Sequence, residues 1–148
     1  MTEAELLELT GEDALEDITD LTLRDRGLTS LPSPELLRRL SNLEVLSFSH
    51  NRLSSLSSLT ACCDRITHLN VSFNALTSLD GLEACRHLTK LYASNNRVRS
   101  LEPLVSCAEL QVWSVVRGWG VFIAATLVTY CTISTSGKVS TKTKDARV

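Results

Sequence analysis

The sequence predicts an α/β solenoid, a fold in which short repeated units stack side by side. Two observations carry this prediction: an apolar pattern that recurs along the chain, and an asparagine at the same place in three of its copies. The pattern has the form L-x-x-L-x-L-x-x-N-x-L-x-x-L, and successive central residues Leu21, Leu46, Leu69, Leu91 and Trp113 are 25, 23, 22 and 22 residues apart. A period of about 20 to 50 residues indicates units that bury their apolar faces only by stacking on neighbours.

The outer copies of the pattern are degenerate. Full-length copies cover residues 18–31, 43–56, 66–79 and 88–101. In the first copy Arg26 stands where the asparagine is due, which is common in terminal repeats. A fifth copy begins at Leu110 and fails at Gly118, which takes the place of its asparagine. We therefore expect about four to five repeats.

Each unit is predicted to contain a strand, a turn at the asparagine and a return segment. In a strand such as Leu69-Asn70-Val71, the alternation of side chains turns the two aliphatic residues inward and the residue between them outward. The first return differs from the others, because Pro32 and Pro34 break regular pairing and the leucines that follow fit one helical face. This fuller helical return explains the 25-residue step.

Three asparagines, Asn51, Asn74 and Asn96, are predicted to form a structural ladder. Backbone groups at a sharp turn leave the strand ladder and still need hydrogen-bond partners. An amide side chain both donates and accepts, so stacked asparagines can link one turn to the next. We interpret these residues as part of the fold rather than of a binding site.

The N-terminal residues 1–17 are predicted to form a capping helix. Thr2 and Glu5 have the T-x-x-E spacing of a capping box, and leucines follow directly. Such a helix would cover the open apolar end of the first repeat.

The repeats, residues 18–116, resemble the leucine-rich-repeat superfamily. Returns such as Leu76-Thr77-Ser78-Leu79-Asp80-Gly81-Leu82 resemble its short 22-residue class, typified by the leucine-rich regulatory subunit of protein phosphatase-1. The resemblance implies a short parallel β-sheet on a concave face and helical or 3-10 turns on a convex face. It also implies a cytoplasmic or nuclear protein, or one associated with the cilium or centrosome, that binds a protein partner such as a phosphatase or a cytoskeletal or ciliary protein.

The function predicted from these features is that of a non-enzymatic protein-interaction module, a scaffold or regulatory subunit, that binds its partner through the concave strand face. Aromatic and charged side chains are typical anchors of such interfaces. The candidate contact residues are the polar and aromatic residues of the strands and of the positions just after them: Tyr92, Lys90, His68, Asn70, Phe73, His50 and Arg24. For Phe73, packing between turns is an equal alternative.

Composition argues against several other classes of function. A formal net charge of −2 disfavours nucleic-acid binding. No nucleophile, base and acid stand in a recognisable motif, and no cysteine or histidine pair has metal-ligand spacing, so we expect no enzyme, no metal and no cofactor. The N-terminus lacks the pattern of a secretory signal, and we interpret the five cysteines as reduced thiols of a monomeric intracellular protein.

Residues 117–148 are atypical, apolar at first and then basic. Arg117 and Lys138 enclose about 20 residues without a charge, long enough to cross a bilayer as a helix. A tail-anchored membrane protein with a cytosolic repeat head is therefore the alternative, with membrane contact only through residues 118–137. The other two readings are strands that cover the last repeat and an end that replaces the repeat architecture.

Overall fold

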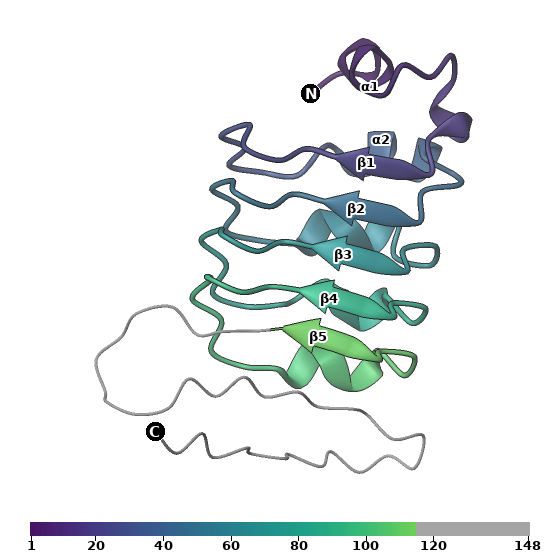
Figure 1. Cartoon of the computed structure of the whole chain (residues 1–148). Helices are drawn as coiled ribbons and strands as arrows, with labels where there is room; N and C mark the ends of the chain where they lie inside the picture. Colours follow the sequence, from purple (N-terminus) through teal and green to yellow (C-terminus); the bar gives the residue numbers. More distant parts are fainter. Residues whose placement is uncertain (115–148) are drawn as a thin grey trace, which may run out of the picture.

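A computed structural model describes residues 1–114, and these residues form a stack of parallel β-strands (Figure 1). Within that range the sheet has five strands in the order β1-β2-β3-β4-β5. Their bounds are β1 Asp20–Thr22, β2 Val45–Ser47, β3 His68–Asn70, β4 Lys90–Tyr92 and β5 Val112–Ser114. The register pairs the repeat positions directly, with Leu21 opposite Leu46, Leu46 opposite Leu69, and Leu69 opposite Leu91. The predicted α/β solenoid is confirmed.

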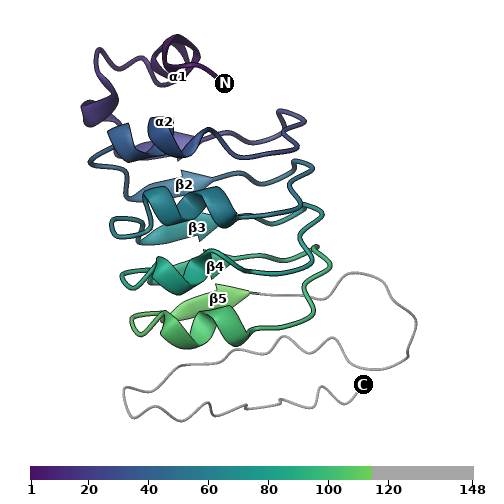
Figure 2. The ribbon, with the colours of Figure 1, turned by 180° about the vertical axis from the view of Figure 1, so that it is seen from behind.

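Helical segments return the chain along the convex side of the sheet (Figure 2). The first return is an α-helix, α2 Pro34–Arg39, and the later returns are the 3-10 helices η2 Ser57–Ala61, η3 Leu82–Ala84 and η4 Glu102–Ser106. The side chain of Ser33 caps α2, and Pro34 occupies its first turn, where a missing N–H costs no hydrogen bond. The predicted contrast between a fuller first return and tighter later ones is therefore confirmed.

The N-terminal helix α1 Glu3–Thr10 lies beyond β1 at the end of the stack (Figure 1). Its capping box is formed: the backbone N–H of Glu5 donates to Thr2 Oγ1 at 3.3 Å, and that of Thr2 donates to Glu5 Oε2 at 2.6 Å. Leu6 is fully buried, and Arg39 Nη2 of α2 donates to Glu3 Oε1 at 2.7 Å. The short 3-10 helix η1 Leu15–Asp17 then leads into β1.

The core is a set of aliphatic columns that run through all repeats. The central strand leucines of β1 to β4 are at most 1% exposed, whereas the strand residues on either side face outward or are half-buried. Leu76, Leu79 and Leu82 of one return are also fully buried. Each repeat therefore shares its interior with both neighbours, which is why no repeat is stable alone.

The three ladder asparagines link each turn to the preceding one. Asn51 Oδ1 accepts hydrogen bonds from the backbone N–H groups of Arg26 and Leu28, both at 3.0 Å, and its Nδ2 donates to Leu23 O at 2.7 Å. Asn96 repeats the arrangement two turns later, accepting from Leu76 N at 3.1 Å and donating to Val71 O at 2.9 Å. The first repeat has no preceding turn, so Arg26 at its ladder position costs no hydrogen bond between turns.

The turn of the third repeat follows the same scheme. Asn74 Oδ1 accepts from Leu53 N at 2.9 Å, and its Nδ2 donates to Phe48 O, also at 2.9 Å. These bonds satisfy backbone groups that the strand ladder leaves without partners.

We predict that Leu69→Ala lowers the free energy of unfolding by about 2–5 kcal/mol, because the side chain is 1% exposed and its loss leaves a cavity between neighbouring repeats. Urea unfolding followed by circular dichroism measures the effect. Leu101→Ala makes the same deletion at a residue that is 38% exposed, and should cost clearly less. Equal losses at the two sites would contradict a shared interior.

A second prediction concerns the ladder. Asn96→Ala should lower the free energy of unfolding by about 1–3 kcal/mol for each backbone group left without a partner, because the side chain is 2% exposed. The control is Asn95→Gly, which removes the neighbouring exposed amide and tolerates its φ of 56°. An Asn96 variant as stable as the wild type would refute the structural role of the ladder.

Candidate functional site on the concave face

The parallel register brings four of the predicted contact residues together on the concave face. His68 and Asn70 lie on β3, Lys90 and Tyr92 lie on β4, and the register pairs His68 with Lys90 and Asn70 with Tyr92. Lys90 and Tyr92 are exposed, Tyr92 at 40%, whereas His68 and Asn70 are half-buried. The site therefore presents an exposed cation and an exposed phenol on one strand beside a half-buried polar pair on the next.

Local hydrogen bonds hold that polar pair. His68 Nδ1 and Thr67 Oγ1 are 2.9 Å apart, and Asn70 Oδ1 accepts from the backbone N–H of Ser72 at 3.1 Å. Beside Lys90 on the next strand lies Val112, which is 40% exposed. The face thus combines fixed polar groups with exposed apolar surface, as protein-binding patches do.

The other three predicted contact residues form a second row, just beyond the strand ends. Arg24 Nη2 lies 3.3 Å from His50 Nε2, and the His50 ring stacks on Phe73 with centroids 4.2 Å apart and planes at 12°. Because a guanidinium only donates, His50 Nε2 is the acceptor in this contact. Phe73 contacts the neighbouring turn through this stack and remains 46% exposed.

The turn position that His50 and Phe73 share has a left-handed backbone. Asp25, His50, Phe73 and Asn95 have φ values of 55° to 57° at equivalent positions of four repeats. Asparagine and aspartate tolerate this conformation, whereas a phenylalanine there is strained. The sequence analysis missed this feature, for which the only signal is the Asn95-Asn96 pair in the fourth repeat. Strain of this kind is concentrated at functional sites.

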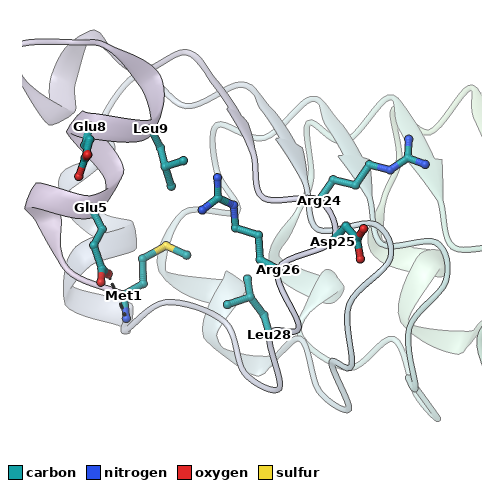
Figure 3. A pocket seen from close by; sticks show the side chains of 8 residues that line it. All are labelled: Met1, Glu5, Glu8, Leu9, Arg24, Asp25, Arg26 and Leu28. Atoms are coloured by element: carbon teal, nitrogen blue, oxygen red, sulfur yellow. Dashed lines mark ion pairs between the residues drawn. The ribbon is translucent and has the colours of Figure 1, made fainter.

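A groove opens between α1 and the first turn (Figure 3). Its volume is about 880 Å³, and it is lined by Met1, Glu5, Glu8, Leu9, Arg24, Asp25, Arg26 and Leu28. Glu5 and Glu8 of the helix lie on one side of it, and Arg26 extends toward the helix from the turn on the other side. A hydrogen bond from the Thr2 backbone lowers the pKa of Glu5, so this carboxylate stays charged near neutrality. The sequence analysis did not foresee this groove.

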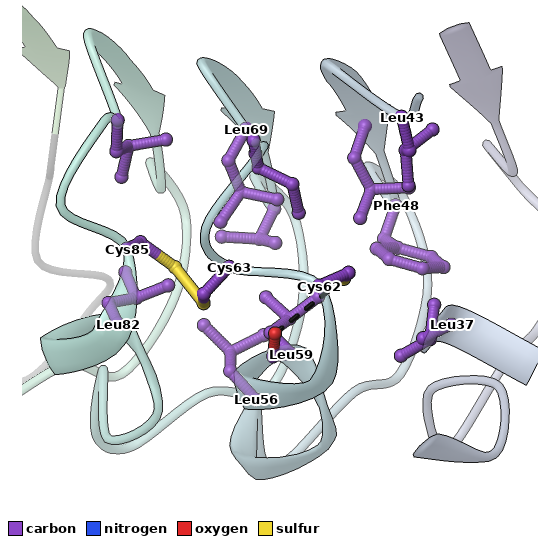
Figure 4. Close-up of a cluster of buried hydrophobic side chains, with 14 of the residues drawn as sticks. Leu37, Leu43, Phe48, Leu56, Leu59, Cys62, Cys63, Leu69, Leu82 and Cys85 are labelled. Carbon is purple, nitrogen blue, oxygen red and sulfur yellow. Dashed lines mark hydrogen bonds between the residues drawn. A yellow bond between two sulfur atoms is a disulfide. The ribbon is translucent and has the colours of Figure 1, made fainter. Parts of the chain in front are cut away.

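The prediction that the cysteines are reduced thiols is wrong for Cys63 and Cys85, which form a disulfide (Figure 4). The physical reason is the stacking of adjacent repeats, which brings the two Cα atoms to 4.4 Å, within the range that a disulfide spans. Their spacing of 22 residues is the repeat period itself. Among residues 1–114, Cys62 and Cys107 are free and buried.

The two free thiols are poor nucleophiles and poor ligands. Burial raises the pKa of Cys62 and that of Cys107 to about 11, so almost no thiolate forms near neutrality. Each thiol donates to a backbone carbonyl oxygen, Cys62 to Leu59 and Cys107 to Leu82, at 3.6 and 3.3 Å. Within the described part of the chain no three histidine, cysteine or acidic side chains gather as a metal site.

Over residues 1–114 no helix is long and apolar enough to cross a bilayer. The predictions about residues 117–148, including a membrane segment at 118–137, concern residues outside the described part of the chain.

Comparison with known proteins identifies the repeats. A model of leucine-rich repeats, in two copies, matches residues 41–84 and again residues 64–106. The chain is a leucine-rich-repeat protein. It is 29% identical over 99 residues to the protein phosphatase 1 regulatory inhibitor subunit PPP1R7 homolog of Arabidopsis thaliana. The alignment covers 67% of this chain and 29% of that protein.

A second relative has a different kind of name. Over 97 residues the chain is 35% identical to the geranylgeranyl transferase type-2 subunit alpha of Rattus norvegicus, covering 64% of this chain and 17% of that protein. The leucine-rich-repeat chain thus spans less than a third of the length of these relatives.

Solved structures show the same fold. An internalin (inlF) from Listeria monocytogenes superimposes with a TM-score of 0.59 at 19% identity, covering 74% of this chain and 41% of the internalin. Internalin C2 of the same organism gives a TM-score of 0.52 at 22% identity, covering 76% and 62%. At these identities the likeness establishes the leucine-rich-repeat architecture alone.

The cysteines give a third prediction. In the purified protein without reductant, iodoacetamide at pH 8 should label neither Cys62 nor Cys107 until the chain is unfolded, because burial keeps their pKa near 11. Cys63 and Cys85 should be labelled only after unfolding and reduction together. Peptide mapping by mass spectrometry assigns each site. Labelling of Cys63 in the unfolded, unreduced chain would show that the disulfide is absent.

Proposed function

We propose that this leucine-rich-repeat protein is a non-enzymatic protein-interaction module that binds its partner through the concave strand face. The observation that carries the proposal is the cluster of Lys90, Tyr92, His68 and Asn70, which the parallel register places side by side. Tyrosine is enriched among residues that dominate binding energy, because it combines a large apolar ring with one hydrogen-bonding group.

The shape of the sheet supports the same proposal. In residues 1–114 the return helices all lie behind the strands, so no helix covers the outward face of the sheet (Figures 1 and 2). Solenoids use such extended faces for binding, since each repeat adds one equivalent position to the surface.

A phosphatase is the partner that we propose first. The support is the similarity to the protein phosphatase 1 regulatory inhibitor subunit homolog, which aligns with 67% of this chain. The alignment with the geranylgeranyl transferase subunit spans only 17% of that protein, too little to carry its activity over to this chain.

An intracellular location is part of the proposal and rests on the resemblance of the repeats to this class. The Cys63–Cys85 disulfide argues against an intracellular location, because disulfides are rare in the reducing cytosol. Trapping of thiols at cell lysis, followed by mass spectrometry, distinguishes an oxidised pair from a reduced pair in the cell.

The fourth prediction tests the concave face. The double variant Lys90→Ala, Tyr92→Ala should abolish capture of the partner, assayed first with purified protein phosphatase 1 and then by affinity capture from lysate with mass spectrometry. Both side chains are exposed, so the far-ultraviolet circular dichroism should not change.

A matched control alters the convex side. Arg38 on α2 and Val105 on η4 are both exposed, and the double variant Arg38→Ala, Val105→Ala removes a cation and an apolar group in the same way. Capture should survive in this control. Equal capture by wild type and the Lys90, Tyr92 variant would refute binding through this face.

A further inference from the structure

Charge is segregated between the turns and the rest of the described chain. The four segments that follow the strands, 24–31, 49–56, 72–79 and 94–101, hold five arginines and only one acid, Asp25. Residues 1–114 as a whole hold ten basic and sixteen acidic residues. We call the arginines of these segments the basic turn edge, and they are Arg24, Arg26, Arg52, Arg97 and Arg99.

Three of these guanidinium groups have no acidic partner within residues 1–114. Arg26, Arg52 and Arg97 are exposed, and none of them makes an ion pair with another residue of the described range 1–114. Elsewhere in that range one arginine does have an acidic partner, in the Arg39–Glu3 ion pair. The basic turn edge thus offers arginines that can bind external carboxylates in the bidentate geometry that favours this side chain.

The N-terminal part of the edge is offset by acids of the protein itself. Arg24 and Arg26 share the groove of Figure 3 with Glu5 and Glu8 of α1. An acidic ligand would meet repulsion there. The part of the edge that stays open to such a ligand is the part from Arg52 to Arg97.

The spacing of that part fits an extended chain. Arg52 and Arg97 each follow a ladder asparagine, so they occupy the same position two repeats apart, with the small residue Ala75 between them. Two strand spacings are about 10 Å, close to the roughly 9 Å that three residues span in a polyproline II segment, whose side chains at i and i+3 lie on the same face. Carboxylates at positions i and i+3 of a peptide would therefore reach both arginines.

The turn between the two arginine-bearing turns holds an exposed apolar side chain. Phe73 precedes Ala75 by two residues in the same turn and is 46% exposed, although its left-handed backbone is strained. Its ring already packs on His50 on one side, which fixes its orientation. A residue of the peptide between the two acids can cover the ring.

We propose that the edge from Arg52 to Arg97 binds an acidic segment of a protein partner in the polyproline II conformation, with carboxylates at i and i+3 on the two arginines and an apolar side chain on Phe73. This inference rests on the proposed function, because both require a protein partner. It adds to that function the chemical nature of the bound segment and a second contact surface on this protein. The acidic excess outside the turns repels a long polyanion, which favours a short peptide over nucleic acid.

The test uses the full chain and fluorescent peptides in an anisotropy titration. The first peptide has glutamates at i and i+3 with leucine between them, the second replaces both glutamates by glutamine, and the third places the glutamates at i and i+1. Only the first should bind well, with affinity falling about tenfold or more in the others, since charge-assisted hydrogen bonds are lost.

Charge reversal at the two arginines tests the same contacts from the side of the protein. The variant Arg52→Glu, Arg97→Glu should lose the glutamate peptide and gain affinity for its lysine counterpart. The control Arg38→Glu, Arg86→Glu makes the same change of net charge at exposed arginines outside the turns and should bind like the wild type. Equal loss in the control would reduce the effect to net charge and overturn the proposal.

A third variant separates binding from folding. Phe73→Asn places at this position the residue that the next repeat uses as Asn95, with φ of 56°. Its melting temperature should equal or exceed that of the wild type, because the backbone strain is relieved, while peptide affinity should fall. Unchanged affinity would remove Phe73 from the site.

The remaining outcomes distinguish this inference from the function proposed above. The Lys90→Ala, Tyr92→Ala variant should still bind the acidic peptide. No peptide binding by the wild type, combined with partner capture that still needs Tyr92, would overturn the edge and leave the concave face in place. An oligonucleotide that binds more tightly than the peptide, with the same dependence on Arg52 and Arg97, would assign the edge to nucleic acid instead.

Discussion

The stacking of repeats in one parallel register is the constraint from which the rest of the structure follows. A strand of three residues makes few hydrogen bonds and has no interior of its own, so it persists only because equivalent leucines of its neighbours close over it. The turns raise a second difficulty, since the chain leaves the sheet there with its backbone groups exposed to an apolar interior. Asn51, Asn74 and Asn96 remove that difficulty by bonding each turn to the one before.

The same register creates the surfaces on which function is proposed. Because every repeat repeats the path of the last, residues at one position of the pattern form a row across the molecule. One row brings Lys90 beside His68, and another stacks the His50 ring on Phe73, while Arg24 of the preceding pattern position lies against His50. Residues more than 20 positions apart in the sequence thus become neighbours through the stacking of adjacent repeats alone.

How far the sequence predicts this arrangement depends on whether a feature repeats. The strand centres, the asparagine positions and the helical first return follow from periodic signals, since Leu69 or Asn74 has an equivalent in each neighbouring repeat. The left-handed backbone at Phe73 carries no such signal, because a bulky residue there contradicts local preference and is held by the surrounding turn. The sequence does not predict the Cys63–Cys85 bond, because an odd number of cysteines indicates reduced thiols and the 4.4 Å approach of the two Cα atoms arises only from the stacking of repeats. The groove beside α1 depends on how that helix docks, which no repeat specifies.

The disulfide also changes how the stack comes apart. A solenoid held only by contacts between neighbours can peel from an end, one unit at a time. Cys63 and Cys85 lie at the starts of the segments that lead into β3 and β4, so the covalent bond makes two adjacent units into one. Fraying that starts at α1 can release the first two units singly, and it then meets a pair that must open together. Mechanical and proteolytic resistance is thereby concentrated in the half of the described stack that carries Lys90 and Tyr92.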